Sequence, residues 1–476
     1  MSLANIIQGG IIQIVGSSIS KVGFFLLMLW LARVLTVSEF GIFGLAYSLL
    51  MMFTWFSTLG FSSSLLKLIP KYLHNIKEKA AIIKSSTVAI IFGTIFFGFI
   101  LFFYPSIFMR DSSDLDVIQD VFFIVSLSLP FSVIPRLIGV YFQADSRMKE
   151  CTKIQYTYRS FFVIISIVAF VTYSNTLINA VYGLMFGLLL TTVYSVFVLQ
   201  VNMERNYFLI NSSNKIDHLK YTVPMFFSGL AFHLMLQYPN IVASSNLTPI
   251  ELGLFVSSVL LSSQIFIVGN SISASLVPVI SRLHRVGKEQ EIRNIFLDFV
   301  KALQVMLIPF FIILFLYGER IMEIYGDEYQ KASPYFVIFA ISWLFYLVKG
   351  PISEYFQATE RQGLDVKNHY AVLIYMIVAM LLVNPSIMNI AAVFASSIIV
   401  LSCIEICELY FIDKINIFAW IKGKSLLSYA TLFGCSFYFS ETPLLLLIPF
   451  FIYYVFVYKY RAILGLNNLI ENKKIL

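Results

Sequence analysis

Charged residues are scarce in this chain. Asp, Glu, Lys and Arg make up 12% of its 476 residues, whereas hydrophobic residues make up 59%. A soluble domain usually carries about 25% charged residues, because charged surface keeps it dispersed in water. The composition therefore excludes an ordinary soluble protein and predicts that much of the surface faces lipid.

Cysteine and histidine are also scarce, and this argues against metal and redox chemistry. The five histidines are scattered, and the four cysteines show no paired metal-ligand spacing and no disulfide framework. The sequence contains no phosphate-binding loop, no HExxH motif and no G-x-S-x-G motif. We therefore expect neither an enzyme nor a bound cofactor or metal.

The first ten residues, Met1 to Gly10, contain no Lys or Arg. A cleavable signal sequence begins with a basic region, so we expect the first helix to be retained. The chain also lacks a Lys/Arg stripe that alternates with exposed aromatic residues, which argues against a nucleic-acid partner.

Long apolar stretches fill most of the sequence. A membrane-spanning helix needs about 20 apolar residues, and on this basis the sequence predicts an all-α polytopic membrane protein with about 14 transmembrane helices. The predicted spans are 10–33, 40–66, 82–104, 118–144, 153–173, 177–201, 219–240, 251–280, 295–317, 332–357, 367–384, 387–411, 425–440 and 442–459.

Two segment pairs reveal an internal repeat. Residues 35–43 and 247–255 are identical at five of nine positions, at an offset of 212. Residues 141–147 and 355–361 are identical at five of seven positions, at an offset of 214. The shared residues include Glu, Gln and Arg, so chance similarity between apolar helices is a poor explanation.

The repeat offset covers six predicted helices. Because six is even, both copies have the same orientation, and a pseudo-two-fold axis along the membrane normal should relate them. We expect two six-helix lobes, 1–210 and 211–412, followed by two additional helices in 413–476. Transporters built from such repeats bind substrate between the halves near the middle of the membrane.

Ionisable residues inside the predicted helices are candidates for a binding site, because they are costly in lipid. Lys21 and His233 occupy equivalent positions in the two repeats, and Arg136 and Lys349 are equivalent to within a residue. Arg159 lies within the fifth predicted helix. Lys67 lies at a helix end, where extension of the side chain to the membrane surface is the simpler interpretation.

Acidic residues inside the predicted helices are fewer than basic ones. We expect Glu354 to be a partner of Lys349, and Glu405 and Glu408 to mark the membrane boundary. An interior with more cations than acids favours an anionic ligand, because Lys, Arg and protonated His compensate buried phosphate charge.

Three segments resemble a known family. Leu31–Leu35 followed by Ser38–Phe43 is similar to the first interhelical turn of polysaccharide-biosynthesis flippases. Leu59–Lys67 resembles their second helix, which ends in glycine, small residues and a cation. These are the O-antigen repeat-unit flippases of the multidrug/oligosaccharidyl-lipid/polysaccharide (MOP) exporter superfamily. The predicted architecture of two six-helix lobes and two further helices resembles theirs along the whole chain. It also resembles the fold of the MATE transporters, which belong to the same superfamily.

The resemblance implies a function. Such proteins move an undecaprenyl-pyrophosphate-linked oligosaccharide from the inner to the outer leaflet of the bacterial inner membrane by alternating access. The partners that the resemblance implies are that lipid-linked glycan, membrane lipid, and the polymerase and chain-length regulator of the same pathway. The cationic residues Lys21, Arg159, Arg136, Lys349, His233 and Lys67 would then surround the pyrophosphate.

Two alternative functions remain open. A peptidoglycan-precursor (lipid II) flippase shares the architecture, and this sequence hardly distinguishes it from a repeat-unit flippase. A MATE-type cation or drug antiporter should instead have buried carboxylates in its cavity, and helices 1, 2, 5, 7, 8 and 11 offer no well-placed acid.

The distribution of basic residues predicts the topology. Most basic residues in the loops follow even-numbered helices, whereas the loops after odd-numbered helices hold only Arg33, Arg110, Arg320 and Lys331. Cytoplasmic loops are rich in Lys and Arg, so both termini should be cytoplasmic. Reporter fusions active only in the cytoplasm should therefore work at both ends, and an external C-terminus would refute the count of fourteen helices.

Overall fold

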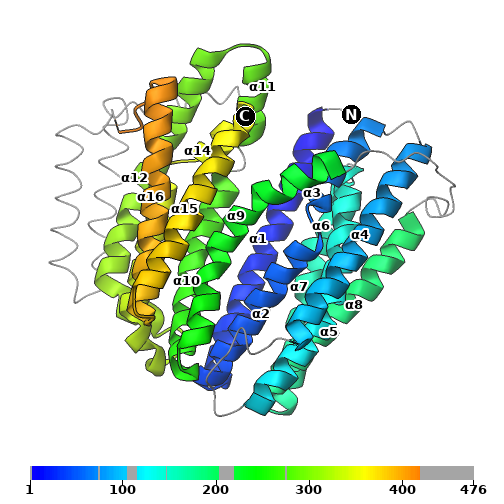
Figure 1. Cartoon of the computed structure of the whole chain (residues 1–476), viewed down its shortest axis with the longest axis vertical. Helices are drawn as coiled ribbons and strands as arrows, with labels where there is room; N and C mark the ends of the chain where they lie inside the picture. The colour runs from blue at the N-terminus through cyan, green and yellow to red at the C-terminus, as the bar shows by residue number, and fades with distance from the viewer. Residues whose placement is uncertain are drawn as a thin grey trace. The chain divides into compact units, whose positions relative to one another are not determined.

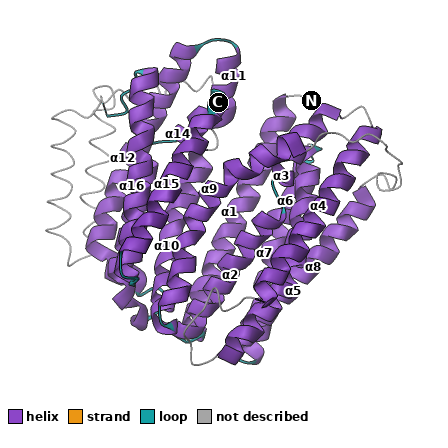
Figure 2. Ribbon diagram, viewed as in Figure 1, coloured by secondary structure: helices purple, strands orange, loops and turns teal. Residues whose placement is uncertain are grey.

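The computed structural model describes residues 3–72, 76–103, 115–145, 147–202, 219–273 and 276–418. Every regular element in these ranges is helical (Figure 1; Figure 2), which confirms the predicted all-α class. The chain forms two compact units, Met1–Val256 and Ser257–Leu476. The borders predicted from the repeat, near residues 210 and 412, remain predictions.

The first unit contains nine α-helices among its described residues, and α10 begins in it and continues into the second. The helices of the first unit are α1 Leu3–Val34, α2 Val37–Ser57, α3 Phe61–Leu68, α4 Ile76–Phe103, α5 Leu115–Ala144, α6 Met148–Thr152, α7 Tyr158–Tyr173, α8 Leu177–Asn202 and α9 Leu219–Asn246. Those that follow are α10 Pro249–Ser273, α11 Leu276–Arg285, α12 Glu289–Met322, α13 Ser333–Val348, α14 Ile352–Ala358, α15 Gln362–Leu382 and α16 Ile387–Asp413.

Ten helical segments in the described part of the chain are long and apolar enough to span a membrane. The protein is therefore a multi-pass membrane protein. The predicted spans 219–240 and 295–317 are helical, within α9 and α12, but are not among these ten. The predicted spans 425–440 and 442–459 lie outside the described residues, so the count of fourteen remains a prediction.

Large apolar side chains cover the outer surfaces of several helices. Phe92 and Phe96 on α4 are 68% and 60% exposed, and Leu381 and Leu382 on α15 are 77% and 80% exposed. Apolar surface of this extent would aggregate in water, whereas in a bilayer it meets hydrocarbon. These helix faces are therefore lipid-facing.

The first pair of repeated segments forms the same capping structure in both copies. Thr36 precedes α2, and its backbone N–H donates to Glu39 Oε2 at 3.0 Å while Glu39 N–H donates back to Thr36 Oγ1 at 3.3 Å. Thr248 and Glu251 repeat the arrangement at the start of α10, at 3.0 and 3.4 Å. This capping box satisfies backbone donors that a helix start leaves free, and it explains why Thr and Glu recur three residues apart.

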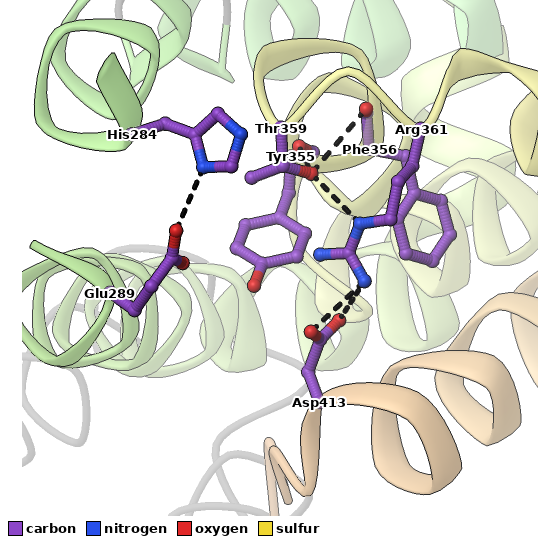
Figure 3. Close-up of polar contacts among 7 residues, drawn as sticks. All are labelled: His284, Glu289, Tyr355, Phe356, Thr359, Arg361 and Asp413. Atoms are coloured by element: carbon purple, nitrogen blue, oxygen red, sulfur yellow. Dashed lines mark hydrogen bonds and ion pairs between the residues drawn. The ribbon is translucent and has the colours of Figure 1, made fainter. Parts of the chain in front are cut away.

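The second pair of repeated segments also folds alike. The backbone N–H of Arg147 donates to Phe142 O at 2.8 Å, and Arg361 N–H donates to Phe356 O at 2.7 Å. Each guanidinium lies over the preceding phenylalanine ring, at 5.4 and 5.7 Å from its centroid. Figure 3 shows Arg361 beside Phe356, with its guanidinium bonded to Asp413 on α16.

Equivalent glycines of the two repeats meet in the first unit. A Cβ on Gly41 of α2 would lie 2.8 Å from the Cα of Gly253 on α10. A Cβ on Gly253 would collide with the backbone of Val37. Because neither glycine has a side chain, the two helix backbones can approach to direct contact.

Two predicted helices are broken in the structure. The predicted span 40–66 divides into α2 and α3 at Leu59 and Gly60, whose φ angles are +47° and +77°. The predicted span 332–357 divides into α13 and α14 at Gly350, with φ of +77°, followed by Pro351. Proline cannot donate a helical hydrogen bond, and glycine readily adopts the left-handed backbone, so both features favour a break.

The glycine contact generates a stability prediction. Gly253→Ala should destabilise the protein by about 1–3 kcal/mol, the usual cost of forcing extra volume into a packed interface. Gly363→Ala is the matched control, because Gly363 is also helical and a Cβ added there would meet nothing within 4 Å. Thermal unfolding in detergent should show a lower midpoint for Gly253→Ala only, and equal midpoints would contradict the close approach.

Candidate functional site

Arg159 stands at the start of α7, directly after an irregular turn. Residues Lys153–Thr157 form a π-helical turn between α6 and α7. Such turns hold one extra residue and are common at functional sites. Within this turn, Gln155 Nε2 donates to the backbone carbonyl of Arg136 on α5 at 3.3 Å. The turn thus links the two segments that carry the partly buried Arg136 and Arg159.

The guanidinium of Arg159 reaches two neighbouring helices of the first unit. Its Nη2 donates to Ser132 Oγ on α5 at 3.2 Å and lies 3.4 Å from Met51 Sδ on α2. Ser132 also accepts a hydrogen bond from Thr54 Oγ1 on α2, at 2.9 Å. Tyr47 on α2 is close enough to interact with the arginine electrostatically. None of these neighbours carries a carboxylate.

Arg136 lies one helical turn beyond Ser132 on α5. Its Nε atom is buried and has no hydrogen-bond partner among the described residues. Its guanidinium interacts electrostatically with both Arg159 and His233. The structure therefore brings together three of the residues singled out in the sequence.

Proline shapes α5 around this group. Pro135 has no backbone N–H, so it cannot bond the carbonyl of Phe131 four residues earlier. Thr192 Oγ1 on α8 donates to that carbonyl instead, at 2.9 Å. A neighbouring helix thus satisfies the backbone group that proline leaves free, as a membrane interior requires. α5 therefore continues as one helix through Pro130 and Pro135.

His233 packs against an aromatic ring of α2. Its imidazole centroid lies 4.1 Å from the ring of Trp55, which also stacks with Phe226 at 5.8 Å. Gly229 lies between these positions on α9, and a Cβ there would meet Trp55 Cζ2 at 2.6 Å. Phe226, Gly229 and His233 therefore form one face of α9 that receives the tryptophan.

Lys21 and Lys67 have less defined surroundings. Lys21 is half-buried on α1, next to Ser20, whose hydroxyl contacts that of Ser160 on α7. This contact places the α1 segment beside the residue that follows Arg159. Lys67 belongs to α3, and its side chain lies outside the described part of the structure. The roles of both residues in binding remain predictions.

Lys349 is in the second unit and has a buried acidic partner. It is 1% exposed, and its Nζ donates to Glu405 Oε2 on α16. The prediction that Glu354 is its partner is therefore wrong for the hydrogen-bonded pair, which Lys349 forms with the fully buried Glu405. The prediction that Glu405 and Glu408 mark the membrane boundary stays a prediction. With its charge compensated by Glu405, Lys349 is a weaker ligand for an anion than an arginine without an acidic partner.

The two arginines have a charge that the surrounding protein does not balance. No carboxylate pairs with Arg136 or Arg159 in the described ranges, and the residues that act on them electrostatically are tyrosines, His233 and each other. Burying an uncompensated charge is expensive. Two guanidiniums beside an imidazole are therefore suited to bind an anion, and phosphate oxygens match the planar donor fork of arginine.

Comparison with known families identifies the chain. Residues 6–284 match the family model described as "Polysaccharide biosynthesis protein". The chain belongs to this polysaccharide biosynthesis protein family. The resemblance to polysaccharide-biosynthesis proteins that the sequence indicated is therefore confirmed. No match was found among curated proteins.

Solved structures of transporters share the fold. The lipid II flippase MurJ in an inward closed conformation has a TM-score of 0.69 at 15% identity, with 94% of this chain and 98% of that chain covered. An inward-facing multidrug resistance MATE family transporter has a TM-score of 0.67 at 11% identity, with 81% and 92% covered. A MOP superfamily transporter from Pyrococcus furiosus, whose description notes a reversed polarity of the binding pocket, has a TM-score of 0.63 at 13% identity, with 87% and 96% covered.

The contrast between Arg136, which is partly buried without an acidic partner, and Lys349, which is fully buried with one, predicts opposite effects on stability. Arg136→Met should leave the unfolding midpoint in detergent unchanged or raise it, because it removes a partly buried charge that has no acidic partner among the described residues. Glu405→Gln should destabilise by about 3–5 kcal/mol, because it leaves Lys349 buried beside a neutral group. A destabilised Arg136→Met would mean that the arginine is a structural residue.

Proposed function

We propose that the protein is a flippase that moves an undecaprenyl-pyrophosphate-linked oligosaccharide repeat unit to the outer leaflet of the bacterial inner membrane. Membership of the polysaccharide biosynthesis family supports a substrate from that pathway. The observation that carries the proposal is the group formed by Arg136, Arg159 and His233, which has cationic donors and, among the described residues, no carboxylate partner for either arginine.

A pyrophosphate fits this group for electrostatic reasons. The headgroup carries several negative charges, and taking it out of water requires positive charges and hydrogen-bond donors in its place. The two guanidiniums supply both. Lys21, on the α1 segment that contacts α7, would add a third positive charge. The polyprenyl chain would remain in the bilayer, which the exposed apolar faces of α4 border.

A cation or drug antiporter is a poorer match to this chemistry. Organic cations need a nearby carboxylate, whereas the group in the first unit would repel them. A lipid II flippase, the function named for the MurJ structure, would handle the same undecaprenyl-pyrophosphate chemistry with a different sugar. We favour the repeat unit because the matching family is one of polysaccharide biosynthesis. Cytoplasmic termini and contacts with a polymerase and chain-length regulator belong to this proposal.

Binding of undecaprenyl pyrophosphate to the purified protein in nanodiscs tests the proposal. Arg136→Gln and Arg159→Gln should each weaken binding at least about tenfold, since a hydrogen bond to a charged group contributes about 1.5–3 kcal/mol. Arg282→Gln is the matched control, because Arg282 lies on α11 in the second unit, outside this group. Unchanged affinity in the Arg136→Gln/Arg159→Gln double variant would refute the site.

Export in cells tests the substrate. Lys21→Ala and Arg159→Ala should abolish surface polysaccharide while the protein still reaches the membrane at normal levels. Full export by both variants would contradict a cationic site. Two complementation experiments separate the alternatives. If the protein rescues cells depleted of their lipid II flippase but does not restore surface polysaccharide to cells that lack this protein, its substrate is the peptidoglycan precursor instead.

A further inference from the structure

A long apolar groove runs along α5 in the first unit. α5 packs against both α4 and α8 (Figure 1), and its residues between positions 130 and 141 form the floor of the groove. Residues between positions 83 and 95 of α4 form one wall, and Val196 and Leu199 of α8 form part of the other. The groove has a volume of about 380 Å³. Packed protein interiors leave few voids larger than a water molecule, so a space of this size calls for an occupant.

The groove is separate from the group formed by the two arginines and His233. Val133, Ile134 and Leu137 line the groove, whereas Ser132 and Arg136 do not. Successive residues of an α-helix are about 100° apart around its axis, so Ser132 and Arg136 lie on a different side of α5 from the groove floor. The helix therefore stands between the groove and the proposed pyrophosphate site.

The lining of the groove offers little to water. Apart from Tyr141, its only polar side chains are two threonines of α4. Thr87 Oγ1 donates to the carbonyl of Ile83 at 2.8 Å, and Thr94 Oγ1 donates to that of Ile90 at 2.7 Å. Both hydroxyl hydrogens are therefore used within α4. An apolar cavity of this kind stays dry and accepts apolar ligands.

The mouth of the groove faces hydrocarbon. Ile91 and Ile95 on its α4 rim are 51% and 64% exposed, and Phe92 beside them belongs to the lipid-facing surface. Val133 on the floor is only 2% exposed. Lipid chains at the mouth thus have direct access to the groove. A chain that enters it regains the dispersion attraction that the walls of an empty void forfeit.

The dimensions of the groove fit a single lipid chain. Its α4 wall extends from Ile83 to Ile95, twelve residues further, which is about 18 Å at 1.5 Å per residue. The hydrocarbon of one leaflet is about 15 Å deep, half of the roughly 30 Å core. The volume spread over this length gives a mean cross-section of about 20 Å², which admits one hydrocarbon chain but not two.

A lysine stands at the end of the groove nearest the membrane surface. This end contains Ile83, close to the start of α4, and Tyr141, close to the end of α5. Lys84 follows Ile83 and is half-buried. A lysine at the end of a span extends its ammonium to the lipid headgroups, where it attracts anionic lipid. The predicted topology makes this the cytoplasmic leaflet.

A second lysine closes the same end of the groove. Lys79 pairs with Asp145 at 2.6 Å, and its ammonium lies 5.7 Å from the ring centroid of Tyr141. Its charge is thus compensated within the protein. We propose that the groove binds one acyl chain of an anionic phospholipid, whose phosphate lies at Lys84.

This lipid is a structural ligand and not the transported substrate. It fills the space between α4 and α8 above the floor of α5, and a ligand that binds only the folded protein stabilises it by mass action. The site goes beyond the proposed function, because it is independent of which molecule the protein transports.

Native mass spectrometry of the full-length protein in detergent tests the site. On titration with dipalmitoyl phosphatidylglycerol, the wild type should bind one molecule more tightly than those that follow. Thr94→Phe should weaken this first binding at least about tenfold, because its ring occupies the groove and excluding two methylenes from apolar surroundings already costs about that factor. Val88→Phe is the matched control, because Val88 is on the same helix, is 53% exposed and does not line the groove. Equal first affinity in Thr94→Phe and the wild type overturns the proposal.

Photolabelling of the wild type keeps the test independent of how well the variant folds. Phosphatidylglycerol with a diazirine in its acyl chain, illuminated in nanodiscs, should modify Val133, Ile134 or Leu137 on the groove floor as well as Phe92 on the lipid-facing surface. Modification of Phe92 without any label on the floor shows that lipid does not enter, and it overturns the proposal.

Competition between lipids tests the headgroup and the source of the chain. Lys84→Gln should reduce the preference for phosphatidylglycerol over phosphatidylcholine about fivefold, the factor that one lysine near the membrane surface contributes. Lys288→Gln is the control, because Lys288 is exposed and belongs to the second unit. An unchanged preference in Lys84→Gln overturns the assignment of the phosphate. If undecaprenyl phosphate displaces the first phosphatidylglycerol more effectively than further phosphatidylglycerol does, the occupant is a polyprenyl chain and the phospholipid proposal is wrong.

Discussion

The cost of burying an uncompensated charge in a low-dielectric interior governs the polar groups of this protein. The second unit meets that cost internally, because Lys349 and Glu405 neutralise one another among buried helices. The first unit does not, because Arg136 and Arg159 have no acidic partner among the described residues. The same constraint therefore gives one unit an internal ion pair, and in the other it favours the anionic substrate that the proposed function assigns to the two arginines.

The backbone obeys the same constraint. Pro135 leaves the carbonyl of Phe131 without its helical donor, and Thr192 supplies one. Gly350 breaks a helix, and Gln304 bonds a carbonyl beside the break. In lipid, no water is available to satisfy such groups, so each irregularity near a functional side chain needs a side chain from another helix. Threonine and glutamine at these positions stabilise the irregular backbone that presents Arg136 and Lys349.

Features set by local sequence were predictable. The apolar stretches gave the helices, and the repeated Thr and Glu residues marked the starts of α2 and α10 because a capping box needs only a four-residue segment. The choice of Arg136, Arg159 and His233 as candidates also needed only their cost in a membrane.

Features set by packing were not predictable in the same way. The neighbours of Arg159 on α2 and α5 are far away in sequence, although Ser132, one helical turn before Arg136, was a visible signal. Lys349 has an acid five residues away, Glu354, yet its hydrogen-bond partner is Glu405, which is 56 residues away. The short sequence separation favoured Glu354 as the partner, whereas the break at Gly350 places Lys349 and Glu354 on different helices. The continuity of α5 through Pro135 likewise depends on a donor from α8.

The meeting of Gly41 with Gly253 has a mechanical consequence. Helices usually interlock through side-chain ridges, and one helix can turn against another only by lifting those ridges out of their grooves. At this crossing backbone touches backbone, and one turn away the side chain of Val256 on α10 is seated over Gly44 of α2. Main-chain atoms have no rotamers, so the separation of α2 and the start of α10 is fixed here more rigidly than a contact between side chains would fix it.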